Sequence, residues 1–348
     1  MSNSITKKIR KSFLYESVLR KIRPYTSARF NWDKVIKDAE VVNSSESKIL
    51  IATSTGGLWP CSSFESLLAI ALTLRGVSVK ILLNDGLIDA CQECESYWLN
   101  EKRFLSEGNK SICSSSYHHA KKMYDSLGIE VLKYSDYNYQ SNYEINISID
   151  EHARAGALRY LGRGSLNGPI HNQILKKYEK ASELTKRVID NITNRYNFTS
   201  VVFHHGIYVP QGIIGDVCRK KNIHVINWGP SYRKGTVLFS HNDTYHRTIL
   251  TDDNNWTQMK WCSEKNIKLM NYLNSRKTGT NDWISFQNKS LNEDIYSSLG
   301  IDQKKPIVTL LTNVLWDAQL HFKGHIFKSM IDWLFYTIDY FKKMRRLN

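Results

Sequence analysis

An apolar strand that opens into a polar loop and then into a helix is the pattern that most constrains this chain, because it begins three times along the sequence. The first unit runs from residues 48–52 through a turn with Gly56 and Gly57 into an apolar helical stretch at 64–74. The second begins at 200–203 and continues into a histidine-bearing loop. Strands that alternate with helices form parallel sheets, and parallel sheets bind ligands at the carboxyl ends of their strands. We therefore expect an α/β fold with its functional residues in these loops.

The third unit begins at Pro306 and determines the expected domain organisation. Its strand would be 307–311, and its helix would follow a loop at Thr312 and Asn313. A single strand cannot bury both of its faces, so this part has to pack on the first domain, pair with another chain or belong to a longer protein. We favour the last of these three possibilities. We predict three regions: a basic amphipathic segment (1–43), a Rossmann-like domain (44–300) and the incomplete start of a second Rossmann-like domain (301–348).

The chain carries an excess of positive charge, with 48 Lys and Arg against 33 Asp and Glu and a formal net charge of +15. Such a surface attracts phosphates, anionic lipid headgroups or acidic sugars, although a basic surface can also serve solubility alone. The segment 1–43 places basic and apolar residues at nearly helical spacing, which fits a helix on a membrane surface and a helix packed on its own domain equally well. No apolar run reaches the roughly 18 residues that span a bilayer, and no signal-peptide core is present. We expect a cytoplasmic protein.

Two loops that follow strands supply the first candidate residues. Gly56 and Gly57 allow backbone N–H groups to approach an anion closely, but the same glycines also suit a simple structural turn. They match neither a P-loop nor a dinucleotide fingerprint. His204 and His205 end the strand at 200–203, where an imidazole can act as a general base or donate a hydrogen bond to a phosphate. We favour His205 as the catalytic residue.

A second strand of this region ends near Asn227 and leads to a turn with two cations beside an aromatic ring. Tyr232, Arg233 and Lys234 suit a clamp for phosphate or carboxylate, and a solvated turn is the alternative. His241 lies in a polar segment after the next apolar strand and is a further candidate for substrate binding.

An acidic helix start carries another pair of candidates. Glu151 would serve as a base and Arg154 would bind an anionic substrate if this helix borders the cleft. The alternative is that the acids at this position only cap the helix and interact with its dipole.

A cysteine-bearing excursion at 88–119 contains a metal-ligand spacing. Cys91 and Cys94 are separated by two residues, Cys113 follows, and His118 comes five positions after Cys113. Three thiolates and an imidazole satisfy a tetrahedral structural zinc, whereas three reduced thiols explain the same residues without metal. In an intracellular chain these cysteines are not expected to form disulfides.

Three longer strings carry a resemblance to a known family. They are His-His-Gly-Ile-Tyr-Val-Pro-Gln-Gly at 204–212, Tyr-Arg-Lys-Gly-Thr at 232–236 with Phe-Ser-His at 239–241, and Leu-Thr-Asn-Val-Leu-Trp-Asp at 311–317. Together they resemble bacterial capsule and lipopolysaccharide glycosyltransferases of the two-Rossmann-domain (GT-B) type. The resemblance extends from about residue 48 to the end of the chain and includes Asn313 among the substrate-binding residues.

The resemblance implies a nucleotide-sugar donor bound mostly by the C-terminal domain and a saccharide or lipid-linked saccharide acceptor bound mostly by the N-terminal domain. It implies no catalytic metal, and we expect no nucleic-acid partner beyond the nucleotide moiety. A peripheral contact with the inner membrane would come from the basic segment 1–43, if that segment does not pack on its own domain. In this interpretation His205 or Glu151 is the base, and Arg233 and Lys234 neutralise anionic substrate. Two other functions remain open: a sugar-nucleotide epimerase of the same architecture, and a non-catalytic protein of polysaccharide assembly or binding.

Overall fold

A computed structural model describes residues 45–140, 145–248, 257–276, 282, 294–317 and 326–344. These residues form two compact units. The first comprises 45–140, 145–228, 239–248 and 315–317, and the second comprises the remaining described residues. The basic amphipathic segment expected at 1–43 lies outside the described residues.

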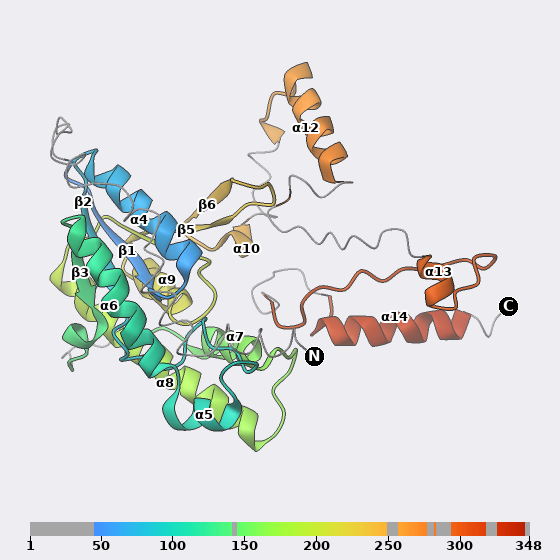
Figure 1. The fold of residues 1–348 in the computed structure, drawn as a ribbon, viewed down its shortest axis with the longest axis horizontal. Coiled ribbons are helices and arrows are strands. Elements are labelled where there is room, and N and C mark those ends of the chain that lie inside the picture. The colour runs from blue at the N-terminus through green and yellow to red at the C-terminus, as the bar shows by residue number, and fades with distance from the viewer. Residues whose placement is uncertain are drawn as a thin grey trace, which may run out of the picture. The chain divides into compact units, whose positions relative to one another are not determined.

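A six-stranded sheet organises the first unit (Figure 1). Its strands are β1 (Lys48–Ser54), β2 (Ser78–Leu83), β3 (Glu130–Lys133), β4 (Ser200–His204), β5 (His224–Pro230) and β6 (Val237–His241). Their spatial order is β3-β2-β1-β4-β5-β6, and the pairs from β3 through to β5 are parallel. This is the strand order of a Rossmann-like fold, in which the order reverses between β1 and β4. The α/β fold with a mostly parallel sheet is therefore confirmed.

Helices cover both faces of the sheet, and alternate residues of β1 show how. Ile51 packs in one cluster with residues of α4 (Trp59–Thr73) and α6 (Lys110–Ser126). Leu50 and Ala52 pack in the other cluster, with residues of α7 (Asp150–Leu161), α8 (Pro169–Arg195) and α9 (Gln211–Lys220). Because successive side chains of a strand point to opposite faces, this alternation places one helical layer on each side. A strand that is buried on both faces needs an uninterrupted apolar sequence, which is why β1 was recognisable.

The excursion expected at 88–119 is part of the first unit's core rather than a separate lobe. It contains α5 (Glu101–Glu107) and the start of α6, which begins at Lys110. Ile88 and Phe104 are fully buried, and Phe104 stacks on Tyr160 of α7 with ring centroids 4.1 Å apart. A short 3-10 helix, η2 (Tyr134–Tyr137), follows β3.

The second unit contains α12 (Ser263–Arg276), α13 (Ile295–Ser298) and α14 (Met330–Met344), whereas α10 (Tyr245–Thr248) belongs to the first unit. The strand predicted at 307–311 is not formed, and Leu311 is 86% exposed. An apolar run becomes a strand only when another strand satisfies its backbone groups, and no such neighbour pairs with this run within the described ranges. The helix predicted after it is present as α14. None of the described helices is both long and apolar enough to cross a membrane.

Candidate functional site

The two loops that the sequence singled out lie at one edge of the sheet. β1 and β4 are parallel neighbours, with Leu50 opposite Val201 and Ile51 opposite Val202. Their carboxyl ends therefore point the same way, and the residues after them meet at the point where the strand order reverses. In open α/β sheets this switch point is where ligands bind. His204 and His205 thus occupy the position predicted for a functional loop.

The backbone of His205 is held in an uncommon conformation, with φ at +68°. Its N–H donates to the Trp228 carbonyl oxygen at 3.0 Å, and its own carbonyl oxygen accepts a hydrogen bond from the Thr244 hydroxyl at 2.8 Å. A left-handed conformation is unfavourable for a residue other than glycine, and such residues gather at functional sites. This outlier supports a functional role for the loop.

Three histidines and two tyrosines form what we call the imidazole cluster: His204, His205, His246, Tyr208 and Tyr245. The ring of His205 lies 4.7 Å from that of His246, 5.1 Å from that of Tyr208 and 5.5 Å from that of His204, measured between centroids. The rings of Tyr245 and His246 are 4.1 Å apart. All three histidines are half-buried, so the cluster is sheltered but reaches the surface.

His204 is uncharged at neutral pH. Burial lowers its pKa to about 4, and the positive charges of His246 and Arg159 act in the same direction. Its Nδ1 atom is buried and has no hydrogen-bond partner among the residues that the structure describes. A neutral imidazole in this position can accept a proton or donate a hydrogen bond to a bound molecule.

A group around Tyr208 joins two of the strings on which the family resemblance depends. The Tyr208 hydroxyl donates to Asp317 Oδ1 at 3.0 Å. The guanidinium group of Arg159 lies 5.4 Å from the ring centroids of both Tyr208 and Trp316. Arg159 was not predicted from the sequence, because a cation in the last turn of a helix ordinarily complements the helix dipole.

A fully buried carboxyl group beside the imidazole cluster was also missed. Glu65, on α4, accepts a hydrogen bond from the Trp228 indole Nε1 at 2.8 Å, and the Trp228 ring contacts the ring of His204 with centroids 4.9 Å apart. Burial raises the pKa of Glu65 to about 7. The local sequence gives no signal for this, because a glutamate in a helix is usually solvent-exposed.

A second buried polar arrangement fixes the same loop from the other face of the sheet. The buried ring of His152 on α7 donates from Nδ1 to the Ile207 carbonyl oxygen at 2.5 Å, and its Nε2 lies 2.9 Å from Asp216 Oδ2 on α9. Despite its partial burial, Asp216 has a pKa lowered to about 2, because His152 and Arg219 both bind the carboxylate. The two ring nitrogens of His152 thus connect the loop after β4 to α9.

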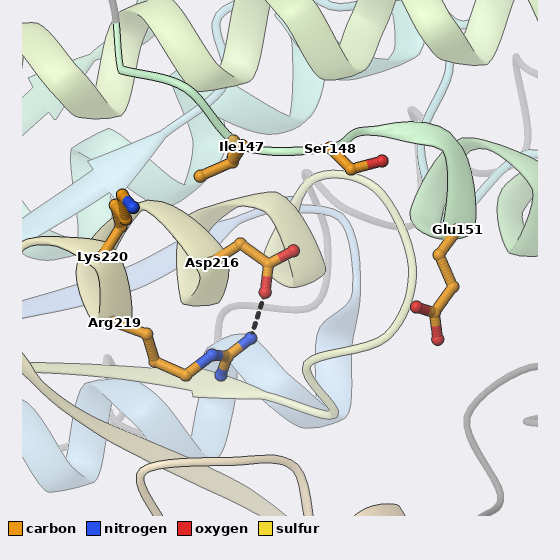
Figure 2. A pocket seen from close by; sticks show the side chains of 6 residues that line it. All are labelled: Ile147, Ser148, Glu151, Asp216, Arg219 and Lys220. Carbon is orange, nitrogen blue, oxygen red and sulfur yellow. Dashed lines mark hydrogen bonds and ion pairs between the residues drawn. The ribbon is translucent and has the colours of Figure 1, made fainter.

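Glu151 lies in a different environment from the imidazole cluster. Its carboxylate pairs with Arg247 at 2.8 Å and lines a pocket of about 440 Å³. Figure 2 shows this pocket between the start of α7 and the later turns of α9, with Asp216 and Arg219 joined by an ion pair. This ion pair occupies the Glu151 carboxylate, and the roles of His205 and Glu151 as a base stay predictions.

The surroundings of Gly56 fit a structural turn, and the binding roles of Gly57 and Arg154 stay predictions. A Cβ atom at Gly56 would come within 2.9 Å of Ser116 O and Ala120 Cβ on α6, so this glycine allows close helix packing. Gly57 is half-buried beside it, at the beginning of α4. Arg154 is exposed on α7.

His241 lies at the opposite edge of the sheet from His205. Its ring stacks on that of His224 with centroids 5.1 Å apart, and its Nδ1 is 3.1 Å from His224 Nε2. His224 is the first residue of β5 and therefore marks the amino end of the parallel strands. The end of β6 therefore lies beside the start of β5, away from the loop of His205, and the role of His241 in substrate binding stays a prediction.

The remaining binding candidates belong to the second unit. Tyr232 is 65% exposed. Arg233 begins a turn, because its carbonyl oxygen accepts hydrogen bonds from the backbone N–H and the hydroxyl of Thr236. Lys234 is exposed in the same turn. Asn313 is exposed, and its side-chain oxygen accepts a hydrogen bond from the next backbone N–H at 2.7 Å. Their roles in substrate binding stay predictions.

The three predicted thiol ligands lie together in the core, fully buried. Hydrogen bonds from the thiols of Cys113 and Cys94 lower the pKa of Cys91 below its ordinary value. His118 does not join them, because its side chain is exposed and five residues along α6 from Cys113 correspond to a different helix face. No group of three or more His, Cys, Asp or Glu among the described residues has an arrangement that could hold a metal ion. A zinc site formed by the thiols stays a prediction.

No family model matches the chain, and no curated protein matches it either. The functional argument therefore depends on the geometry of the described residues and on the strings at 204–212 and 311–317.

Proposed function

We propose that this chain is a glycosyltransferase of surface polysaccharide biosynthesis, and that the first unit binds the saccharide or lipid-linked acceptor beside the imidazole cluster. The observation that carries this proposal is the position of His205, in a strained conformation among other imidazoles, at the switch point of a Rossmann-like sheet. This is the edge at which such sheets bind their ligands.

The reaction needs a base within reach of an acceptor hydroxyl. In the proposed step His205 takes the proton of that hydroxyl while the acceptor oxygen forms a bond to the anomeric carbon of the donor. The bond from that carbon to the phosphate oxygen breaks at the same time, and the nucleoside diphosphate leaves. Because His204 is neutral, it adds no positive charge that would oppose proton uptake by His205.

The departing diphosphate needs cations, since its charge develops in the transition state. Arg233 and Lys234 are the proposed cations, in agreement with the family resemblance. Arg159 is a third cation, held against the rings of Tyr208 and Trp316 next to the imidazole cluster.

The test compares the purified protein with a variant that removes only the imidazole. Asn tolerates a positive φ better than most residues, so His205→Asn preserves the backbone of the loop. Each protein is incubated with a panel of nucleotide sugars and saccharide or lipid-linked acceptors, and products are detected by mass spectrometry. We expect transfer by the native chain and a loss of about 100-fold or more in the variant.

His224→Asn is the matched control, because it removes an imidazole from the amino edge of the same sheet, and it should retain transfer. Absence of transfer with every pair of substrates would refute the proposal, and so would full activity of His205→Asn. Isomerised nucleotide sugar in the absence of an acceptor would favour an epimerase instead.

A further inference from the structure

Glu65 combines complete burial with neighbours on three strands. Its side chain is 0% exposed. The Trp228 indole on β5 donates to Oε1 at 2.8 Å, and the Thr53 hydroxyl on β1 and the His204 N–H on β4 are near enough to favour the ionised carboxylate. The carboxyl group therefore lies where the carboxyl ends of β1, β4 and β5 come together.

The second oxygen of this carboxyl group, Oε2, lacks a well-oriented hydrogen-bond donor. Oε2 is buried and meets no donor with hydrogen-bond geometry in the described part of the chain. A buried carboxylate with one good hydrogen bond is costly, and a carboxyl group in such a place retains its proton to higher pH. The resulting pKa, about 7, means that both forms of Glu65 are populated near neutral pH.

Trp228 connects Glu65 to both histidines of the loop. Its indole ring contacts the ring of His204 at 4.9 Å and that of Phe64 at 4.2 Å between centroids. Its carbonyl oxygen accepts the N–H of His205 at 3.0 Å. Whatever fixes the Trp228 side chain thus also fixes the surroundings of His204.

We propose that Glu65 is a positioning residue for the imidazole cluster and that it acts through Trp228. When ionised, it holds the indole by a charge-assisted hydrogen bond, which is shorter and stronger than a neutral one. When protonated, it is a weaker acceptor and has a proton of its own to donate. The orientation of the indole against His204 then depends on pH.

Few groups act on the Glu65 carboxyl group itself, and two further imidazoles, His205 and His246, act on His204 rather than on Glu65. On α4, burial and the charges of Glu65 and Glu93 raise the pKa of Cys61 far above neutrality, so its thiol stays protonated. On β4, His204 is already neutral above about pH 4. Thr53 on β1 and Trp228 on β5 do not titrate in this range. Glu65 is therefore the group in this set that changes charge near pH 7.

Nuclear magnetic resonance tests the inference without any assay of sugar transfer, so the inference and the proposed function can fail separately. The indole Nε1 proton of Trp228, assigned with Trp228→Phe, should move downfield with a midpoint near pH 7 as Glu65 ionises. Ring resonances of His204 should shift with the same midpoint. In Glu65→Gln, which keeps an acceptor oxygen for the indole, the titration of the indole proton should disappear.

Glu130→Gln serves as the control, because it removes an exposed carboxylate from β3 of the same sheet and should leave the titration unchanged. The Glu65 side-chain ¹³C resonance of the native chain gives the midpoint directly if Glu65→Gln does not fold. An indole resonance that is constant between about pH 5.5 and 8.5, or one that still titrates in Glu65→Gln, would overturn the inference. So would a side-chain midpoint near the ordinary value for glutamate.

Discussion

The raised pKa of Glu65 predicts a specific change in folding stability with pH. Glu65 has a pKa of about 7 in the folded chain and 4.5 as the ordinary value. A group whose pKa is raised on folding stabilises the fold fully below its unfolded pKa, and this contribution is lost as the pH rises through the folded pKa. We therefore expect Glu65 to lower the free energy of unfolding progressively between about pH 4.5 and 7.

The magnitude follows from the two pKa values. At about 1.36 kcal/mol per pH unit, the whole loss is about 3 kcal/mol, of which about 2.5 kcal/mol falls between pH 5 and pH 8. His204 has the opposite effect, because its pKa falls from 6.5 to about 4 on folding. Its contribution is lost as the pH falls below 6.5, and it amounts to about 2 kcal/mol over the same interval. The native chain therefore shows little net change from the two groups.

The variant Glu65→Gln separates these effects. Its free energy of unfolding, measured by urea denaturation at several pH values, should rise relative to the native chain by about 2.5 kcal/mol between pH 5 and pH 8. Any pH-independent cost of the substitution cancels in this comparison. Glu130→Gln should show no such relative rise. A difference between Glu65→Gln and native chain that is constant across the interval would refute the assignment of the proton to Glu65.

Three further predictions concern the support of the site and the thiols. His152→Ala leaves the carboxylate of Asp216 without its buried donor and should lower the free energy of unfolding by about 3 kcal/mol in urea denaturation. Gly212→Ala places a methyl group against the His152 ring and should lower the free energy of unfolding by more than about 2 kcal/mol. Its control is Gly128→Ala, where a methyl group meets open space but φ is positive, and this variant should lower the free energy of unfolding by about 1 kcal/mol in the same assay. In the native chain one thiol, the exposed Cys262, should react rapidly with a thiol reagent, and the five buried thiols should react only after unfolding; two or more fast thiols would contradict the packing.

The elements that could be predicted from the sequence are those whose own residues carry a recognisable pattern. β1 and β4 are buried on both faces, and such strands need continuous apolar runs that are visible without any partner. The segment 307–311 has the same local pattern and yet forms no strand, because pairing depends on a neighbour that the pattern does not specify. His241 was grouped with the other candidates for a similar reason. The residues of β6 do not indicate the direction in which this strand runs beside β5.

In the candidate site, too, the residues next to a recognisable strand could be predicted, and those placed by distant residues could not. The histidines at 204 and 205 could be found because they follow a recognisable strand. Glu65 could not, because its burial depends on Trp228, which is 163 residues away in the sequence. Arg159 also acquires its surroundings from residues far along the chain, Tyr208 and Trp316. Side chains that contact a site through residues distant in the sequence are thus the ones that sequence patterns do not reveal.

The loop that carries His205 is fixed by buried polar groups on both faces of the sheet. On the α4 side, Glu65 holds Trp228, whose carbonyl oxygen accepts the N–H of His205. On the α7 side, His152 holds the carbonyl oxygen of Ile207, two residues further along. Apolar residues of similar volume would often give a more stable core than buried carboxyl and imidazole groups. Stability therefore does not explain these residues. A fixed position for His205 would explain them under the proposed function, because a general base has to be held within hydrogen-bond reach of its substrate.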